Sequence, residues 1–400
     1  MEIIGDLHIH SMYSRATSKN LNFQNLVKYS KIKGLGLLGT GDFSHPKWME
    51  EIKKLKEEGK GIYSFQDFPF ILTNEISLVF TQNGKGRRIH LIVLAPSLEI
   101  AEQITSYLKT KGRIDYDGRP IFNISCEEFV EKMKEIDEYI EIIPAHIWTP
   151  WFGLFGSMSG FDSIKECFGD KADKIHSIET GMSSDPEMNW RISELNNRSI
   201  LSFSDSHSFW PFRIGREATI FDVEELSYKE IIKDIRDIGI KGTIETEPAY
   251  GKYHFDGHRL CNFSCSPEEA LKLGNICPKC NKMLTIGVEH RVIQLADQNI
   301  EENKNKKPYY KILPLQDLIA GVYSTTPNSK KCWQIYNKLI EMGSEFDILL
   351  KIEKEKLARV VDDKLLRFIL KNREGKIKVK PGYDGVYGVA LFEEQNTLNL

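Results

Sequence analysis

Residues 5–11, GDLHIHS, decide how the rest of this chain is understood. They belong to an apolar, β-like run, IIGDLHI, which delivers His8 and His10. Residues at positions i and i+2 of a strand share one face, so both imidazoles can reach a single ion. A lone HxH is a weak signal, because a buried histidine is more often a satisfied core residue than a ligand. The metal interpretation therefore depends on what the other runs contain.

Short β-rich runs recur through the first 220 residues, and each carries a polar residue at or near its end. Helix-like stretches at 47–58, 126–136 and 186–197 separate most of these runs. Strands that alternate with helices predict a parallel sheet, and about seven of them with chemistry at their ends predict a closed α/β barrel. One exception is NGKG, at residues 83–86, which predicts a hairpin turn between antiparallel strands. The polar residues that follow His10 are Asp42, Glu75, His90, His146, Glu179, Asp205 and His207.

These side chains are of the types that bind divalent ions. SDSH repeats the i, i+2 spacing with Asp205 and His207, and His45 lies three residues after Asp42. Unpaired imidazoles that converge on one barrel mouth would be costly unless an ion compensated their polarity. Imidazole and carboxylate together suit Zn, Mn and Fe.

The composition is that of a globular protein. Of 400 residues, 41% are hydrophobic and 28% are charged, and the formal net charge is −3. That charge gives no global sign of a nucleic-acid binder, although a carboxylate-rich metal site can mask a local basic patch. No apolar run reaches the roughly 20 residues that a membrane span needs, and the amino-terminal residues lack an export-signal pattern. We expect a cytoplasmic protein of two or three domains that does not contact membranes.

Four of the seven cysteines lie in one short segment. The pattern Cys-x3-Cys-x11-Cys-x2-Cys has the spacing of a four-cysteine zinc ribbon, and so small a knuckle could not bury a core without metal. A redox-active CPKC dithiol is the alternative. We prefer a structural zinc with all four positions filled by thiolate. Its predicted ligands are Cys261, Cys265, Cys277 and Cys280.

Several residues have both a functional and a plain structural interpretation. Asp185, in SSDPEMNW, is a candidate catalytic carboxylate, but Asp-Pro ahead of a helix-like run is also typical of a helix N-cap. The aromatic residues after His146 could stack on a planar ligand, or could pack as a lid over the barrel. The tyrosine of PGYDGVYG could stack on the same ligand, or could belong to a β-turn. The candidate stacking rings are Trp148, Trp151, Phe152 and Tyr383.

The motifs GDLHIHS, GTGDFSHP and SDSHS make the chain, up to about residue 225, similar to the PHP (polymerase and histidinol phosphatase) superfamily. The resemblance implies an α/β fold with a distorted seven-stranded (β/α) barrel that holds two or three divalent ions (Zn, Mn, Fe or Mg). It implies that Glu75 bridges two ions, that Asp205 completes the first, and that both are catalytic. The ligands that it implies are His8, His10, Asp42, His45, Glu75, His90, His146, Asp205 and His207.

The chain departs from the superfamily pattern at two motifs. The second motif usually reads threonine-aspartate-histidine, whereas GTGDFSHP leaves the ligand role to Asp42, with His45 close by. Many relatives have another ligand a few residues after HxH, where this chain has SRATS. Either a third ion lacks that ligand here, or Arg15 holds a phosphate in its place.

Over nearly its full length, the chain resembles the endonuclease Q family. The resemblance is carried by GDLHIHS, SRATSK, GTGDFSHP, ETGMSSDP, SDSHS and PGYDGVYG. It implies a DNA repair endonuclease that cuts 5′ of deaminated bases (uracil, hypoxanthine, xanthine) and of abasic sites, using metal-activated water and leaving 3′-hydroxyl and 5′-phosphate ends. The base would be inspected after extrusion from the helix, and the candidate stacking rings would then be DNA-binding residues that stack on it or wedge the helix open. The partner would be damaged double- or single-stranded DNA, with a repair or clamp protein left open.

The sequence pattern changes near Ala249, where the cysteine-bearing segment follows the β-rich runs, and this change divides the chain into three parts. Residues 1–248 would form the PHP barrel, 249–298 the zinc ribbon, and 299–400 a mainly helical region for lesion recognition. Residues 393–400, EEQNTLNL, would be a partner-binding tail or a frayed end.

Two other functions compete with this interpretation. A small-molecule phosphatase of the histidinol-phosphate type would use the same barrel but would leave residues 250–400 without a role. A non-catalytic DNA-binding protein would need a barrel that has lost its activity, and the nearly complete ligand set speaks against that. Replacing Asp205 by alanine separates the endonuclease from the binding module. A binding module would still bind DNA and would lose nothing catalytic.

Overall fold

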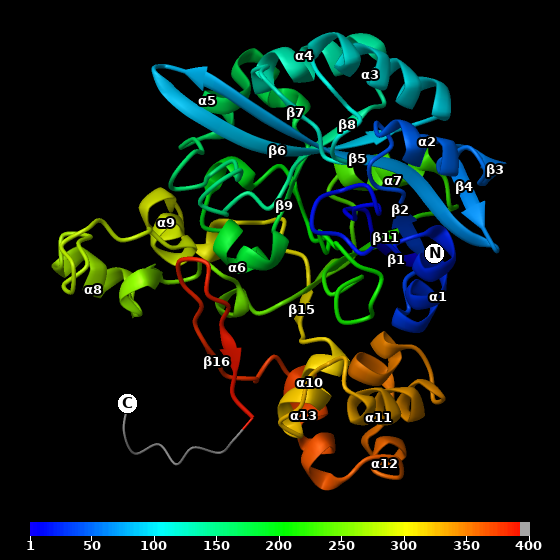
Figure 1. Cartoon of the computed structure of the whole chain (residues 1–400), viewed down its shortest axis with the longest axis vertical. Coiled ribbons are helices and arrows are strands. Elements are labelled where there is room, and N and C mark those ends of the chain that lie inside the picture. Colours follow the sequence, from blue (N-terminus) through cyan, green and yellow to red (C-terminus); the bar gives the residue numbers. More distant parts are fainter. Residues whose placement is uncertain (393–400) are drawn as a thin grey trace.

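A large mixed sheet lies at the centre of the amino-terminal part of the chain (Figure 1). The computed structural model describes residues 1–392. The main path of the sheet runs β15-β12-β11-β1-β2-β5-β4-β3, and β6, β7 and β8 attach through β5 and β6. The strands are β1 (Glu2–Asp6), β2 (Leu37–Gly39), β3 (Lys56–Gly59), β4 (Ile62–Phe65), β5 (Phe68–Gln82), β6 (Lys85–Ala95), β7 (Ile121–Phe122), β8 (Glu141–Pro144), β11 (Ala218–Asp222), β12 (Gly242–Glu245) and β15 (Tyr309–Lys311).

The strand directions are mixed. β1 is parallel to β2, and β2 to β5, but β1 is antiparallel to β11. β5 and β6 form the predicted hairpin, which closes with Gln82 opposite Lys85. β9 (Ser177–Glu179) and β10 (Ser199–Leu201) form a separate parallel pair. The expected α/β class is therefore confirmed. The expectation of a parallel sheet is wrong, because β11 runs antiparallel to both β1 and β12, and the count of seven barrel strands stays a prediction.

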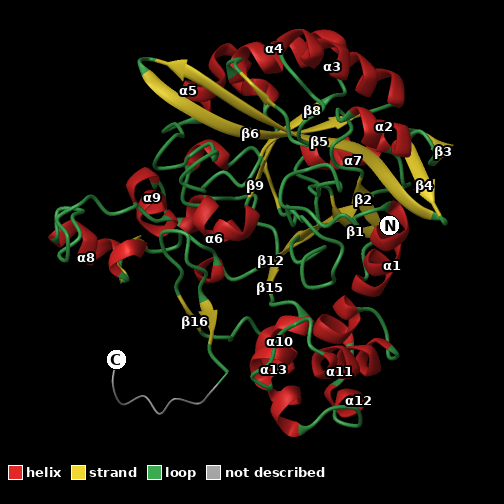
Figure 2. Ribbon diagram, viewed as in Figure 1, coloured by secondary structure: helices red, strands yellow, loops and turns green. Residues whose placement is uncertain are grey.

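Helices lie around this sheet, with α3 and α4 along one edge of the view (Figure 2). Most of them begin at a serine or asparagine whose side chain accepts a hydrogen bond from the first turn, as at Asn22, Ser97, Ser125 and Ser227. The helices of this part are α1 (Phe23–Lys33), α2 (Pro46–Ile52), α3 (Leu98–Lys111), α4 (Cys126–Ile136), α5 (Ile164–Phe168), α6 (Pro186–Asn189) and α7 (Tyr228–Arg236).

The prediction of a helix at 126–136 is confirmed by α4, but two expected helices are shorter than predicted. The helix expected at 47–58 ends at Ile52, because residues 56–59 form strand β3 against β4. The helix expected at 186–197 ends at Asn189, because Ile192 takes an extended conformation. That conformation lets Trp190 and Ile192, two residues apart, both be buried, which one face of a helix would not allow.

Both faces of β5 and β6 are buried, which positions the polar residues that they carry. Leu91 and Val93 belong to a large apolar cluster that includes α3 and α4, whereas Ile92 and Leu94 belong to a smaller one that includes α7. Because side chains alternate along a strand, His90 shares the inner face with Ile92. Glu75 lies opposite Ile92 in the register of the hairpin, so it shares that face too.

The carboxyl-terminal part contains a small cysteine-bearing module and a helical cluster, which lie at different sides of the sheet (Figure 1). The module contains β13 (Asp256–His258), β14 (Phe263–Cys265), α8 (Pro267–Lys272) and α9 (Val288–Leu295). The cluster contains α10 (Leu315–Val322), α11 (Lys330–Ile340), a π-helix (Asp347–Lys351), α12 (Lys354–Leu357) and α13 (Asp363–Arg373). Short 3₁₀ helices occupy Gly169–Lys174, Gly181–Ser183, Ser193–Leu195, Pro248–Tyr250, Arg259–Cys261 and Ile300–Glu302.

PGYDGVYG forms the predicted turn between short strands, since β16 (Val379–Lys380) pairs with β17 (Val389–Ala390). The boundaries at 248 and 298 stay predictions; β15, which follows the second of them, pairs with β12 at the edge of the main sheet. Within residues 1–392, no helix is long and apolar enough to cross a membrane. The predicted tail at 393–400 lies outside the described residues.

Candidate metal centre

The ends of several strands bring the predicted ligands together. His8 and His10 follow β1, Glu75 lies within β5, and His90 lies within β6. The other residues follow short strands in sharp turns. Asp42, His146 and Asp205 have positive φ values of 47°, 30° and 46°. Such conformations are strained for residues with a Cβ and cluster at functional sites.

The ligand atoms form two groups that share Glu75. In each group, all of the candidate atoms lie within 4.8 Å of one another. Oε2 of Glu75 lies 3.1 Å from Nε2 of His10, whereas Oε1 lies 2.7 Å from Nδ1 of His90. One carboxylate thus faces both groups, which is the geometry of a bridge between two ions. The first group is His8, His10, Glu75 and Asp205, and the second is Glu75, His90 and His146.

The environment of these groups fits divalent ions. Nε2 of His8 is buried and has no hydrogen-bond partner among residues 1–392, although it lies 3.5 Å from Oε2 of Glu75 and 3.6 Å from Oδ1 of Asp205. Burial opposes the charged imidazole, but the carboxylates of Glu179, Glu75 and Asp205 outweigh it and raise the pKa of His8 well above its usual value. An ion would compensate the same negative charge that here favours a proton, and the nitrogen and oxygen donors suit Zn, Mn or Fe.

In two histidines of the first group, the ring nitrogen that points away from the other ligand atoms lies next to a carboxylate. Oε1 of Glu179 lies 2.8 Å from Nδ1 of His8, and its Oε2 accepts a 2.7 Å hydrogen bond from the backbone N–H of His146. Oδ1 of Asp42 lies 3.1 Å from Nδ1 of His10. Such partners fix the tautomer and the ring orientation of a metal-binding histidine. Asp42, a predicted ligand, therefore lies behind His10.

His45 and His207 lie beside the two groups without belonging to either. The ring of His45, at the start of α2, stacks on Tyr13 at 4.6 Å. The ring of His207 lies 4.4 Å from that of His10, and its Nδ1 is 3.0 Å from the carbonyl oxygen of Asp205. The ligand roles of His45, His207 and Asp42 stay predictions.

Arg119 also lies at this centre, and sequence reasoning did not include it. Its Nη1 donates a 3.0 Å hydrogen bond to Oε2 of Glu75. Arg15, the alternative phosphate ligand, is 73% exposed, and its Nε lies 3.4 Å from Oδ2 of Asp117. Its role stays a prediction.

Comparison with known proteins places the chain in a family. A family model for the MJ0043 C-terminal domain matches residues 314–376. The uncharacterized protein MJ0043 of Methanocaldococcus jannaschii is 32% identical over 296 residues, which cover 71% of this chain and 35% of that protein, so this chain matches about a third of its length. The uncharacterized protein YqxK of Bacillus subtilis is 29% identical over 408 residues, covering 97% of this chain and 98% of that protein.

Two solved structures match almost the whole chain. The lesion-specific endonuclease PfuEndoQ of Pyrococcus furiosus has a TM-score of 0.88 and 34% identity, covering 98% of this chain and 96% of its own. An endonuclease Q bound to a 27-mer duplex substrate, with an abasic lesion at its active site, has a TM-score of 0.89 and 34% identity, covering 98% and 97%. This chain belongs to the endonuclease Q family. The resemblance seen in its motifs is thereby confirmed, as is the expectation that it is an enzyme of the hydrolase class.

In this endonuclease Q chain, Asp185 lies outside both ligand groups. Its carboxylate accepts a 3.0 Å hydrogen bond from the N–H of Met188, so the alternative of a helix N-cap is confirmed. The same carboxylate lies 3.1 Å from Nζ of Lys311. Its catalytic role stays a prediction.

The predicted DNA-binding rings of the endonuclease Q chain differ in burial. Trp148 is fully buried, and its indole N–H donates to Asn189, so it packs in the core. Phe152, with φ of 66°, is half-buried, and its ring lies 4.3 Å from that of His90. Trp151 and Tyr383 are also half-buried. Phe152 and Trp151 thus have surface to offer a ligand near the centre.

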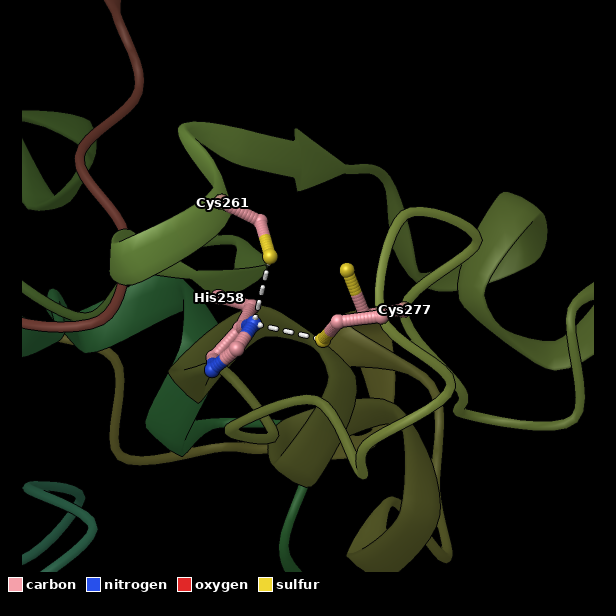
Figure 3. Close-up of side chains that lie close together, drawn as sticks. His258, Cys261 and Cys277 are labelled. Atoms are coloured by element: carbon pink, nitrogen blue, oxygen red, sulfur yellow. Dashed lines mark hydrogen bonds between the residues drawn. The ribbon is translucent and has the colours of Figure 1, made fainter.

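The cysteine-bearing module of the endonuclease Q chain contains a second ligand group. Nδ1 of His258 lies 3.2 Å from the Sγ atoms of both Cys261 and Cys280, and Figure 3 shows His258, Cys261 and Cys277 pointing toward one another. Cys265, a predicted ligand, is buried in β14 and is not a member of this group. The group is His258, Cys261, Cys277 and Cys280.

This second group suits zinc. Burial opposes a thiolate, but backbone N–H groups and His258 outweigh it and lower the pKa of Cys277 to about 6. Sequence reasoning missed His258, although the spacing His258-x2-Cys261 repeats that of Cys277-x2-Cys280. Three thiolates with one imidazole form a known structural zinc set.

Proposed function

We propose that this chain is a metal-dependent DNA repair endonuclease. It hydrolyses the phosphodiester bond on the 5′ side of deaminated bases (uracil, hypoxanthine, xanthine) and of abasic sites, leaving 3′-hydroxyl and 5′-phosphate ends. The observation that carries the proposal is the buried Glu75 carboxylate shared by two ligand groups in a chain of the endonuclease Q family. A relative with 34% identity binds a duplex with an abasic lesion at its active site.

Two divalent ions are proposed for the centre, and His207 is proposed as a ligand of a third. Zn, Mn, Fe and Mg all accept such donors, at different strengths. When bound, the ions would supply Lewis-acid charge and an activated water for an in-line displacement at phosphorus. One structural Zn is proposed for the cysteine-bearing module.

The chain's own residues orient these ligands and leave one side open. Glu179 and Asp42 hold His8 and His10 from behind. Within the first ligand group, Asp205 faces the solvent, since its side chain is 30% exposed whereas that of Glu75 is fully buried. We therefore place the substrate phosphate on the Asp205 side of the centre.

Lesion recognition is assigned to the surface around this opening. An enzyme cannot inspect a stacked base within a duplex, so the damaged nucleotide must be extruded. Trp151 and Phe152 are the rings proposed to stack on bases or to wedge the helix open, and Tyr383 is proposed to stack from the 299–400 region. The partner is damaged double- or single-stranded DNA, bound across the proposed parts 1–248, 249–298 and 299–400.

A nicking assay tests the proposal. Fluorescent duplexes with a single uracil, inosine or abasic site, beside an undamaged control, are incubated with the protein and Mg²⁺ or Mn²⁺. We expect a cut immediately 5′ of the lesion, lost in Asp205→Ala and retained in Asp173→Ala, whose carboxylate is 67% exposed on the surface. Intact lesion DNA together with release of phosphate from small phosphomonoesters would support a small-molecule phosphatase instead. Tight lesion binding without any cut would support a binding module.

A further inference from the structure

Strand pairing sets Arg119 beside the carboxylate that both ligand groups share. β7 runs parallel to β5, with Ile121 opposite Ser77, and the N–H of Ser77 donates a 3.0 Å hydrogen bond to the carbonyl of Pro120. Two residues earlier on each segment, the same register sets Arg119 next to Glu75. The arginine position is therefore fixed by backbone pairing as well as by its own ion pair.

The loop ahead of Arg119 is held against the residues that follow His10. The buried carboxylate of Asp117 accepts hydrogen bonds from the backbone N–H groups of Arg15, at 3.3 Å, and Arg119, at 3.2 Å. The N–H of Gly118 donates to the carbonyl of Tyr13 at 3.2 Å. A Cβ at Gly118 would lie 2.1 Å from Oδ2 of Asp42, so only glycine allows this approach.

Most N–H groups of the Arg119 guanidinium make no hydrogen bond to residues 1–392. Among residues 1–392, its one hydrogen-bond partner is Oε2 of Glu75, although the group carries five N–H donors. Its side chain is 27% exposed, close to the 30% of Asp205, whereas Glu75 is fully buried. Arg119 therefore reaches from the buried carboxylate toward the open side of the centre.

We propose that Arg119 binds the phosphate of the substrate at this centre. A guanidinium fork matches two oxygens of a phosphate, and a fixed donor stabilises the charge that develops in the transition state. The inference rests on the proposed function for its substrate, a DNA phosphodiester, and it assigns to Arg119 the contact that the sequence suggested for Arg15. The competing role for Arg119 is that of a counter-ion that only neutralises Glu75.

Three variants and three measurements test this assignment. Arg119→Ala and Arg119→Lys are compared with Arg113→Ala, whose side chain lies in the same loop but is 74% exposed and pairs with Asp115. The measurements are metal content, binding of inorganic phosphate to the Mn²⁺-loaded protein by calorimetry, and kcat and KM on an abasic duplex.

We expect Arg119→Ala to lower kcat/KM by about 10²- to 10³-fold and to weaken phosphate binding by about 10- to 100-fold, with unchanged metal content. The kcat/KM and the phosphate affinity of Arg119→Lys should lie between those of Arg119→Ala and the wild type. Those of Arg113→Ala should equal the wild-type values. Unchanged phosphate binding in Arg119→Ala, or a loss of ions in step with the loss of activity, would overturn the assignment. If the wild type cuts no lesion duplex, the proposed function fails, while the phosphate titration still decides the role of Arg119.

Discussion

Each imidazole of the first ligand group has one nitrogen toward the shared space and the other held by a carboxylate. The carboxylate of Glu179 contacts Nδ1 of His8, and that of Asp42 contacts Nδ1 of His10. Because a neutral imidazole carries its proton on only one nitrogen, a carboxylate at Nδ1 leaves Nε2 free as a lone-pair donor. These two buried carboxylates are therefore part of the centre, even though neither belongs to a ligand group.

Glu179→Gln should weaken metal binding without removing a ligand. A glutamine keeps one acceptor oxygen in place of two, so either the Nδ1–H of His8 or the backbone N–H of His146 loses its partner. We expect about a 10- to 100-fold loss of metal affinity, measured by Mn²⁺ competition with a chelator. Glu131→Gln, with a side chain that is 53% exposed, is the matched control. Equal affinity in both variants would show that Glu179 does not orient His8.

How far the sequence could predict this centre depends on the residue. His8, His10, Glu75 and Asp205 could be named because each ends or occupies a readable β-like run. Glu179 also ends such a run, but its role comes from His8, 171 residues away, which no spacing reveals. Arg119 precedes a strand of only two residues that exists through its pairing with β5, so no periodic pattern marks it.

At the scale of elements, the cysteine-bearing module shows how strand pairing decides which side chain binds. Cys265 pairs with Asp256 across the β13–β14 hairpin and packs in the same small apolar cluster as Cys277. His258, at the end of β13, lies within reach of the sulfur atoms of Cys261 and Cys280. We therefore expect His258, rather than Cys265, to be the fourth donor.

Variants of the module should separate the two possible ligand sets. We expect Cys265→Ser to keep one zinc per chain and His258→Ala to lose it, because only the second change removes a donor. Co²⁺ substitution provides an optical check, since three thiolates and four thiolates give different charge-transfer intensities. Loss of zinc in Cys265→Ser with retention in His258→Ala would restore the four-cysteine set.

Two neighbouring strands of the sheet bury a pair of carboxyl groups. Glu217 precedes β11 and Glu245 ends β12, and both lie within hydrogen-bond reach of the Ser202 hydroxyl. Burial raises the pKa of Glu245 to about 8, and it raises the pKa of Glu217 well above its usual value. At least one proton is therefore retained in the folded state where the unfolded chain has released it.

Stability should consequently fall as the pH rises between the unfolded pKa of Glu245, near 4.5, and its folded pKa of about 8. The folded state binds more protons in this window, so the loss is up to about 1.4 kcal/mol per pH unit for one group. Glu245→Gln, which keeps the neutral shape, should flatten this dependence in urea unfolding at pH 5 to 8. A slope equal to that of the wild type would mean that Glu245 is already ionised in the fold.

Elements were predictable where they carry their own periodic signal. α4 begins at Cys126, after a serine cap, and ends where expected, because its apolar spacing and its cap agree. Strands of two or three residues, such as β7 and β15, were not predictable, since their existence depends on partners far away in the sequence.

At the scale of the whole molecule, a buried ion pair joins the sheet region to the helical cluster. Nζ of Lys33, at the end of α1, lies 2.7 Å from Oε1 of Glu345, and both side chains are almost fully buried. Glu345 also accepts hydrogen bonds from the hydroxyl of Tyr336, at 2.8 Å, and the N–H of Leu315, at 3.0 Å. One carboxylate therefore ties together α1, α10 and α11.

Lys33→Met should destabilise the protein strongly, because it leaves Glu345 charged and buried without its cation. We expect a loss of about 3–5 kcal/mol in the free energy of unfolding, measured with urea. Lys31→Met, at an exposed position on the same helix, should change little. The double variant Lys33→Met/Glu345→Leu should recover part of the loss. A loss in the double variant as large as in Lys33→Met would assign the effect to packing.

The position of β1 has a consequence for how the protein is made. β1 lies between β2 and β11, so residues 2–5 pair with residues 219–222. A ribosome that adds about 5–20 residues per second leaves one edge of β1 unpaired for tens of seconds. During translation, His8 and His10 emerge long before Asp205, so ions can occupy the complete first group only after more than half of the chain has been synthesised. In that interval the unpaired edge of β1 offers free backbone N–H and C=O groups to any other extended segment, until β11 covers it.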